Sequence, residues 1–351
     1  MGVVEINAFT KEDLKMFQSE PLGAKIRRSI AKIGEWYKFY DNQCYVSFSG
    51  GKDSTVLADL CAKWCKEINT TLYLVFVNTG LEYPEIRKHV EFFAQWLRDK
   101  YGIEVILEIL RPEMRFDQVI KKYGYPIISK EVSQAVAEYR KNPDGCRKAR
   151  FEGTGRYIKS AYSLKKWAPI AKTDIPVSHK CCYVMKKNPA KKYEKETGRK
   201  PIIATMAEES YLRRQKWLIS GCNAFGAKRP TSQPMSFWTE QDVLQYLKIY
   251  DIPIASVYGD IVCDGANNKL KTTGCNRTGC MFCGFGCHLE KPGEGRFERL
   301  KETHPRQYEY CIGGGEYDEN GKWIPNKQGL GLGHVFDELN KIYGENFIKY
   351  K

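Results

Sequence analysis

The sequence predicts an α/β protein with a doubly wound parallel sheet, covered by helices on both faces. Three β-prone runs alternate with helical patterns between residues 44 and 110, and a glycine-rich loop follows the first run. Alternating strand and helix patterns are typical of parallel sheets, and right-handed crossovers place the helices on both sides. A cysteine-rich region is expected to follow toward the C-terminal end of the sequence.

The expected strands are short apolar runs, at residues 44–48, 72–77, 103–110 and 201–205. The run at 72–77 is apolar throughout, as expected of a strand that is buried on both faces. The expected helices carry apolar residues at three- and four-residue steps, at 22–37, 56–64, 86–97 and 239–247. Thr239 followed by Asp242 is a helix-capping pattern, which sets the start of the last helix.

Composition divides the chain into three predicted parts. Residues 1–40 form a helical N-terminal lead-in, 41–250 a nucleotide-binding domain, and 251–351 a cysteine-rich, metal-binding region. No apolar run approaches the roughly 20 residues that span a bilayer. The first residues also lack the basic and apolar regions of a secretory signal. We therefore expect a cytoplasmic protein with no membrane partner.

Positive charge is concentrated in one part of the sequence. The formal net charge is +14, and residues 140–200 hold 18 Lys and Arg against 5 Asp and Glu. Such a span is either a solvated surface or a binding site for a polyanion such as tRNA or DNA. Four aromatic residues interleave with these cations and either stack on bases or belong to the core: Tyr139, Tyr157, Tyr162 and Trp167.

The most informative motif, which we call the phosphate loop, occupies residues 49–55 between an expected strand and an expected helix. It reads Ser49-Gly50-Gly51-Lys52-Asp53-Ser54-Thr55. Two glycines allow a tight turn, successive N–H groups form a nest for an anion, and the following helix adds its positive end. The spacing of a Walker A loop is absent. The loop therefore predicts a binding site for an anionic ligand, to which Lys52 adds positive charge.

The sequence contains thirteen cysteines, which is a high count for the reducing compartment expected here. Their odd number and the lack of an expected export signal favour metal binding over disulfides. Four lie close together in the sequence, at Cys275, Cys280, Cys283 and Cys287, and an adjacent pair occurs at Cys181 and Cys182. By spacing alone, both tetrahedral zinc and an iron–sulfur cluster are open. Three further cysteines fall in strand and helix patterns and are expected in the core: Cys44, Cys61 and Cys65.

The motifs together resemble a known family. The phosphate loop is similar to the PP-loop of ATP pyrophosphatases, of the adenine nucleotide alpha hydrolase-like superfamily. The wider pattern resembles the phosphoadenosine phosphosulfate (PAPS) reductase family. Asn78-Thr79-Gly80 is similar to that family's D-T-G motif, and residues 207–213 are similar to its R-A-x-E-S-x-x-R segment, with Met206 in place of the first arginine. The resemblance implies that Asn78, Gly80 and Arg213 bind nucleotide together with the phosphate loop. It also implies that Lys52 and Asp53 are catalytic residues.

The resemblance also bears on the metal. Cys181-Cys182, followed by Lys186 and Pro189, is similar to the cysteine-pair element of iron–sulfur sulfonucleotide reductases. In that group an adjacent pair joins a later C-x2-C to hold a [4Fe–4S] cluster. The implied ligands are Cys181, Cys182, Cys280 and Cys283, with Cys275 and Cys287 as alternates. Zn²⁺ is the rival.

The resemblance implies an enzyme that uses ATP and Mg²⁺ to adenylate a substrate, release pyrophosphate and prepare it for sulfur transfer from a sulfur donor. A second reading is reduction of PAPS or adenosine phosphosulfate to sulfite with a thioredoxin-like partner. The intact phosphate loop and the lack of a cysteine after Cys311 favour the first reading. A third is a non-catalytic regulator that binds nucleotide. The sequence does not identify the sulfur acceptor.

Overall fold

The computed structural model describes residues 8–265 and 267–351, which form two compact units. Unit 1 comprises Glu82–Arg111, Pro189–Thr278 and the described part of Met1–Asn78. Unit 2 comprises Thr79–Leu81, Pro112–Asn188 and Gly279–Lys351. These units divide the chain differently from the predicted parts 1–40, 41–250 and 251–351. The physical reason is that residues 112–188 pack with the C-terminal region and add no strand to the large sheet.

The large sheet lies in unit 1 and has the order β3-β2-β1-β5-β7-β6. Its strands are β1 (Cys44–Ser47), β2 (Leu72–Val77), β3 (Val105–Leu110), β5 (Lys200–Ile202), β6 (Asn223–Ala224) and β7 (Thr231–Ser232). All neighbours are parallel except β6 and β7, and the register pairs Val46 with Leu74 on the central strands. The predicted α/β class with a mostly parallel sheet is confirmed.

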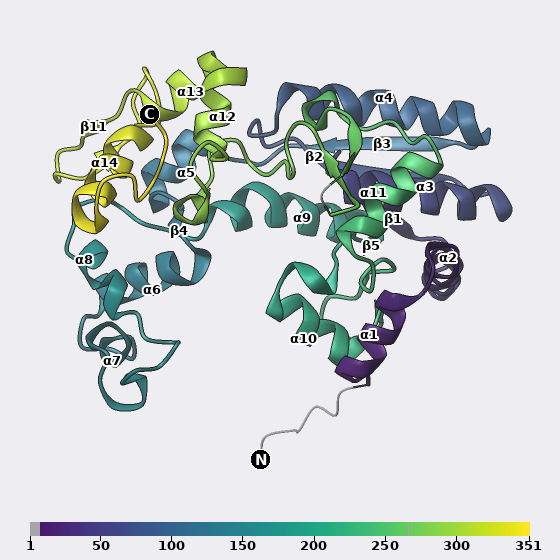
Figure 1. Ribbon diagram of the computed structural model, residues 1–351, viewed down its shortest axis with the longest axis horizontal. Helices are drawn as coiled ribbons and strands as arrows, with labels where there is room; N and C mark the ends of the chain where they lie inside the picture. Colours follow the sequence, from purple (N-terminus) through teal and green to yellow (C-terminus); the bar gives the residue numbers. More distant parts are fainter. Residues whose placement is uncertain (1–7, 266) are drawn as a thin grey trace. The chain divides into compact units, whose positions relative to one another are not determined.

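Unit 1 contains six α-helices, as far as the described residues go: α1 (Lys11–Ser19), α2 (Leu22–Phe39), α3 (Lys52–Glu67), α4 (Pro84–Tyr101), α10 (Tyr211–Ser220) and α11 (Glu240–Ile249). The helix α9 (Asn188–Thr197) belongs to it except for its first residue. Short 3₁₀ turns and a hairpin complete the unit: η4 (Ala207–Glu209), η5 (Ser256–Tyr258), β8 (Ile261–Asp264) and β9 (Lys269–Thr272). Figure 1 shows α3 and α4 running beside β1, β2 and β3.

Side chains alternate between the two faces of the sheet. Val46 and Leu74 point into the main core, which also holds α2, α3, α4, α10 and α11. Tyr45 and Val75, one position away, form a second cluster with Tyr193 of α9 on the opposite face. The sheet is therefore covered on both faces, because successive strand residues point in opposite directions. The expected core cysteines Cys44, Cys61 and Cys65 are all buried in the main core.

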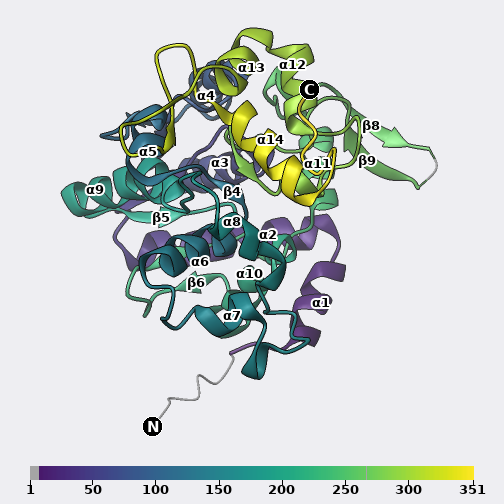
Figure 2. The same ribbon diagram turned by 90° about the vertical axis from the view of Figure 1, so that its left-hand side faces the viewer.

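Unit 2 is mostly helical. Its α-helices are α5 (Phe116–Tyr123), α6 (Lys130–Lys141), α7 (Lys148–Glu152), α8 (Ala168–Ala171), α12 (Arg296–Thr303), α13 (Pro305–Ile312) and α14 (Leu332–Tyr343). The π-helix η3 (Tyr183–Lys187) and the 3₁₀ turns η1 (Gly155–Tyr157), η2 (Lys165–Trp167) and η6 (Cys287–Leu289) lie between them. In this unit α13 packs against α12 and α14, and α8 against α6 (Figure 2).

Two short sheets belong to unit 2. The strand β4 (Ile127–Ile128) pairs in parallel with β10 (Gly284–Phe285), and β11 (Glu316–Tyr317) pairs with β12 (Trp323–Ile324) in a hairpin. The β4–β10 pair joins two segments that are far apart in the sequence. No helix within residues 8–265 and 267–351 has both the length and the apolar composition needed to span a membrane.

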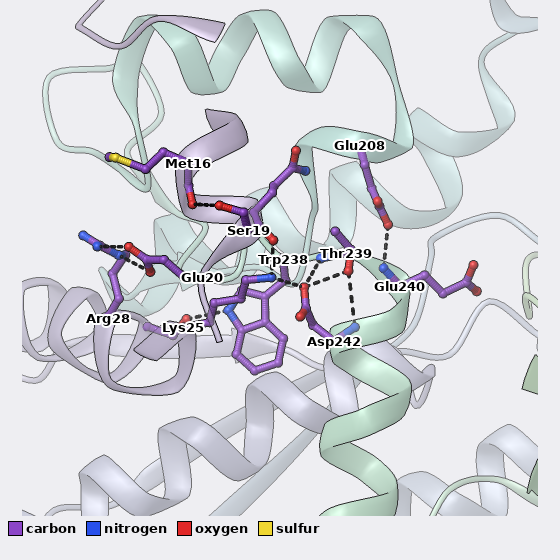
Figure 3. A network of polar contacts seen from close by, with 12 residues as sticks. Met16, Ser19, Glu20, Lys25, Arg28, Glu208, Trp238, Thr239, Glu240 and Asp242 are labelled. Atoms are coloured by element: carbon purple, nitrogen blue, oxygen red, sulfur yellow. Dashed lines mark hydrogen bonds and ion pairs between the residues drawn. The ribbon is translucent and has the colours of Figure 1, made fainter. Parts of the chain in front are cut away.

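A buried ion pair connects α2 to the start of α11 (Figure 3). The Lys25 side chain is only 2% exposed, and its Nζ lies 2.7 Å from Asp242 Oδ2 and donates to the Gln18 carbonyl oxygen. The same Asp242 carboxylate accepts from the backbone N–H and the hydroxyl of Thr239, which completes the predicted capping box. Lys25 therefore neutralises a carboxylate that already holds the first turn of α11.

Replacing Lys25 with Met should lower the free energy of unfolding by about 3 kcal/mol, because Asp242 would keep a buried, unpaired charge. The double variant Lys25→Met/Asp242→Asn should lose less than the sum of the two single variants. Urea unfolding measures both. Lys32→Ala, which breaks the exposed Lys32–Glu35 pair, is the control and should cost less than about 1 kcal/mol. An equal loss from Lys25→Met and Lys32→Ala would contradict this role.

Acid should destabilise unit 1 through His89 of α4, whose Nε2 lies 3.2 Å from Thr55 Oγ1 of α3. Burial lowers the pKa of His89 from 6.5 to about 4. His89 therefore takes up a proton near pH 6.5 in the unfolded chain, but only near pH 4 in the folded chain. Stability is full above pH 6.5 and falls by up to about 3 kcal/mol as the pH drops toward 4. Urea unfolding of His89→Gln should show a smaller fall over this range, and an unchanged fall would refute the assignment.

Candidate functional site

The phosphate loop connects the end of β1 to the start of α3. Gly50 has φ +71°, and a Cβ on it would come within 2.9 Å of side-chain carbons of Ile86 and Val90 on α4. Only glycine fits this position, because it accepts a left-handed backbone and leaves no atom to clash. Gly51 is the N-cap of α3, so the free N–H groups and positive end of that helix lie at the loop. This geometry suits an anion.

The hydroxyl groups of the loop stabilise its own turn. Ser54 Oγ accepts from the Ser49 backbone N–H at 3.2 Å and donates to the Gly51 carbonyl at 2.9 Å. Ser49 and Ser54 hydroxyls also lie 3.0 Å apart, and the buried Thr55 hydroxyl contacts His89. Ser49 and Ser54 therefore support the turn, Thr55 joins α3 to α4, and direct contact of the three side chains with nucleotide stays a prediction.

The two predicted catalytic residues begin α3. Lys52 is 5% exposed, and its ammonium lies 3.4 Å from Glu240 Oε1 and 5.3 Å from the ring centre of Tyr258. Burial raises the pKa of the Asp53 carboxyl, and the positive charges of Lys52 and Arg277 act against that rise. A buried cation beside a carboxylate that resists ionisation is an arrangement typical of functional sites.

Two arginines converge on Glu209, close to the loop in the same unit. Arg213, on the first turn of α10, pairs with this carboxylate, and Arg277 Nη1 lies 3.8 Å from its other oxygen. Burial and the charge of Arg277 lower the pKa of Arg213. Met206, where the resembled motif has an arginine, is 2% exposed, and its backbone N–H donates to Glu209. Arg277 thus supplies a second guanidinium, from a much later part of the sequence than Met206.

The other two predicted nucleotide contacts fall in different units. Asn78 directly follows β2, and its N–H donates to the Leu110 carbonyl at 2.8 Å. It lies at the same carboxyl edge of the sheet as the phosphate loop, because β1 and β2 are parallel neighbours. Gly80 belongs to unit 2 and has φ +76°. Nucleotide contact by both residues stays a prediction.

Four residues near the loop were missed from the sequence: Glu240, Tyr258, Arg277 and Thr278. Tyr258 hydrogen-bonds Thr278, and their hydroxyl oxygens lie 3.3 and 3.8 Å from where a Cβ on Gly51 would stand. None belongs to a local motif, and all four reach the loop from segments much later in the chain. The only available signal was the capping pattern at Thr239, which places Glu240 at the start of a helix.

Four cysteines line one pocket of unit 2, which we call the thiol pocket. It is formed by Leu81, Phe116, Pro126, Cys181, Cys182, Met185, Lys186, Cys280 and Cys283. Cys280 and Cys283 are brought there by the β4–β10 pairing and by the Met281 N–H, which donates to the Leu81 carbonyl at 2.8 Å. The four are the cysteines that the resemblance implied as ligands, and they come from two distant segments.

The adjacent cysteines differ in acidity. They form the first turn of a helix that widens into the π-helix η3, so the positive end of the helix lies beside them. The Cys181 thiol donates toward Cys182 sulfur at 4.0 Å, which raises the pKa of Cys181 and lowers that of Cys182. Lys130 and Lys186 lower the pKa of Cys182 further. A thiolate is the form that binds metal.

The two alternate ligands lie outside the thiol pocket. Cys275 belongs to unit 1, where it is buried and its N–H donates to the Val257 carbonyl. Cys287 donates to the Gly284 carbonyl at 3.0 Å, and burial raises its pKa to about 12. Across the described residues, no three His, Cys, Asp or Glu side chains are placed so that they could already hold a metal ion together. Metal binding would require the pocket thiols to turn toward a common centre.

The basic span is divided between the two units. Residues 140–188 belong to unit 2 and 189–200 to unit 1. Several of its cations are structural: Arg140 donates to four backbone carbonyls between Ile170 and Ile175, and Arg150 pairs with Glu131. The unit 1 part lines a groove with residues 228–230, which we call the lysine groove (Lys191, Glu194, Lys195, Lys200, Pro201, Lys228, Arg229 and Pro230). Binding of a polyanion by residues 140–200 stays a prediction.

The interleaved aromatic residues also separate into two kinds. Tyr139 packs on Phe151, with ring centres 4.8 Å apart, and Trp167 packs against His288, Tyr343 and Phe347. Tyr157 and Tyr162 instead line an open pocket with four polar residues, Glu131, Arg150, Arg156 and Ser160. We call it the tyrosine pocket.

A match to a known protein family covers most of unit 1 and part of unit 2. Residues 43–148 and 157–284 match the family described as "Phosphoadenosine phosphosulfate reductase domain", which is two thirds of the chain. An uncharacterized protein of Methanocaldococcus jannaschii is 26% identical over 286 residues, which are 81% of this chain and 43% of that protein. The chain thus spans less than half the length of this relative.

Three solved structures are similar over part of the chain. They are NMN synthetase from Francisella tularensis (13% identity, TM-score 0.34, 67% of this chain and 73% of that one), NH3-dependent NAD synthetase from Campylobacter jejuni in complex with nitrate (12%, 0.32, 66% and 75%), and the U34-tRNA thiolase NcsA from Methanococcus maripaludis with its [4Fe-4S] cluster (17%, 0.34, 66% and 66%). Agreement at this level is too small to transfer a property of these proteins to this chain.

Proposed function

Because this chain belongs to the phosphoadenosine phosphosulfate reductase domain family, we propose that it is an enzyme that binds ATP at the phosphate loop and adenylates its substrate. The observation that carries the proposal is the loop itself. Left-handed Gly50, buried Lys52 and the N-terminal end of α3 meet at the carboxyl edge of a parallel sheet. Ligands of open α/β sheets bind at that edge.

In the proposed reaction an oxygen of the substrate attacks the α-phosphorus of ATP. The new P–O bond forms as the bond from the α-phosphorus to the bridging oxygen breaks, and pyrophosphate leaves. The loop N–H groups and Lys52 would bind the leaving phosphates, whose negative charge grows in the transition state. Lys52 would exchange its contact with Glu240 for the phosphates. The adenylated substrate would then be ready for sulfur transfer from a separate donor.

Arg213 and Arg277 would hold further anionic oxygens. Both guanidiniums contact Glu209, and each can bind a phosphate or sulfate through two N–H groups. Mg²⁺ would suit Asp53, because carboxylate oxygen is the ligand type that Mg²⁺ prefers. Burial raises the pKa of Asp53, and a bound cation would act against that rise by favouring the ionised form.

For the thiol pocket we propose an iron–sulfur cluster held by Cys181, Cys182, Cys280 and Cys283. The donor set fits, since four thiols line one pocket and the pKa of Cys182 is lowered. A cluster bound there would supply redox or sulfur-carrying chemistry. Zinc could use the same four sulfur atoms, so the metal itself must be measured.

A second candidate is reduction of PAPS or adenosine phosphosulfate to sulfite, with a thioredoxin-like protein as reductant. Two guanidiniums beside one loop favour it, because a sulfonucleotide carries an additional anionic group. Cys311 argues against it as the attacking thiol, since it is fully buried and burial raises its pKa far above the ordinary value. Sulfite formation from PAPS without pyrophosphate release from ATP would favour this candidate.

Lys52→Ala should weaken ATP binding by roughly tenfold or more, because a cation that contacts phosphates contributes at least about 1.4 kcal/mol when it is buried. Asp53→Asn should leave ATP binding largely intact but abolish pyrophosphate release measured with tRNA or DNA as trial substrates. Lys66→Ala, an exposed lysine on the same helix, is the matched control. Wild-type ATP affinity in Lys52→Ala would reject the site. ATP binding without any pyrophosphate release would favour a regulator.

Protein purified without oxygen should be brown and contain about four iron and four sulfide per chain. Replacing Cys181, Cys182, Cys280 or Cys283 with Ser should remove most of the iron and the visible absorbance. Cys275→Ser and Cys287→Ser should retain both, because neither thiol lines the thiol pocket. A colourless protein with one zinc per chain would contradict the iron–sulfur proposal and leave the ATP site untouched.

A further inference from the structure

The tyrosine pocket of unit 2 has features that the proposed adenylation does not use. It lies beside residues 149–156, where the family match is interrupted. The segment is therefore an addition to what the family pattern describes. Its most exposed ring, Tyr162, is 70% exposed, and the neighbouring Ile158 is 65% exposed. An exposed aromatic ring at the edge of a pocket is a surface on which a base can stack.

Hydrogen bonds hold the backbone of Tyr162 in place, while its ring is exposed to solvent. The Tyr162 N–H donates to Ser160 Oγ at 3.2 Å, and its carbonyl accepts from Arg150 Nε at 3.0 Å. Arg150 is 8% exposed and is held in turn by Glu131 at 2.6 Å. A flat ring on a rigid support can stack on another ring with little loss of conformational entropy.

The charge around the pocket suits an anion. Residues 147–166 contain seven Lys and Arg and one acidic residue, Glu152. Exposed Arg156 lies over the Tyr157 ring at 5.0 Å and donates to its hydroxyl at 2.8 Å, which orients the guanidinium toward the pocket-lining ring. The acidic residue that lines the pocket, Glu131, is already paired with Arg150. Rings and cations therefore alternate over a short surface.

We propose that the tyrosine pocket binds a single-stranded segment of nucleic acid, with a base stacked on Tyr162 and an adjoining phosphate held by Arg156. Stacking on aromatic rings beside cations is how proteins bind single strands without reading sequence. Duplex would fit poorly, since its bases are already stacked inside. The proposal deepens the proposed function by naming its substrate class, but binding at this pocket does not depend on ATP.

Fluorescence anisotropy with labelled oligo(U) and oligo(dT) of about 16 nucleotides, without ATP, tests the proposal. Tyr162→Ala should weaken binding about tenfold, whereas Tyr162→Phe should bind like wild type because it keeps the ring. Arg156→Ala should lower the slope of log affinity against log salt by about 0.7, the value for one lost phosphate contact on a single strand. Tyr317→Ala, an exposed tyrosine elsewhere in unit 2, is the matched control.

The two oligonucleotides distinguish the sources, since tighter binding of oligo(U) assigns RNA and tighter binding of oligo(dT) assigns DNA. Tighter binding of a duplex, or no binding of single strands at low salt, would overturn the proposal. So would an unchanged affinity in Tyr162→Ala together with a loss in Lys195→Ala, which would assign binding to the lysine groove. Loss of ATP turnover in Lys52→Ala with normal oligonucleotide binding would leave this inference intact, so the two proposals fail separately.

Discussion

The ammonium group of Lys25 is buried where α2, the end of α1 and the start of α11 meet, and a charge in such a place must be paired. Asp242 supplies the partner, and its carboxylate also caps α11 through Thr239. If α2 or α11 moved away, an unpaired charge would stay in the core, and this would destabilise the fold by several kcal/mol. The pair therefore fixes the first turn of α11 against α2, in the core that packs on one face of the sheet.

The fixed start of α11 extends this constraint to the candidate nucleotide site. Glu240 is the first residue of α11; its backbone N–H donates to Glu208 at 2.6 Å, and its side chain faces Lys52. Glu208 belongs to the same short turn as Glu209, which holds Arg213 and Arg277. The cations around the phosphate loop are thus positioned by carboxylates that are themselves tied to the core. These linked contacts hold the charged groups in a defined position, as electrostatic preorganisation of a binding site requires.

Much of the sheet and the phosphate loop could be predicted from the sequence, because their signals are local. The apolar run of β2, the glycines of the loop and the capping pair Thr239 and Asp242 each act on their own few residues. The contacts of Arg277 and Tyr258 could not be predicted, since they depend on how segments that are distant in the sequence pack together. The division into two units depends on distant contacts of the same kind, because β4 and β10 pair although a large part of the chain separates them. The proposed ligand set of the thiol pocket came from family resemblance, because spacing alone did not separate Cys275 and Cys287 from Cys280 and Cys283.

Charge is the property that sequence composition described least well, and the reason is geometric. A count over residues 140–200 treats every cation alike, but a guanidinium that donates to backbone carbonyls, as Arg140 does, is saturated by the fold. The Arg199 guanidinium carbon lies 3.3 Å from the ring centre of Tyr73, so this cation also contributes to packing. The cations available to a ligand are those that stay exposed and lie beside an exposed aromatic ring. Which residues these are depends on the folded structure. The net charge of a basic segment therefore indicates a binding site less well than the few cations in it that make no structural contact.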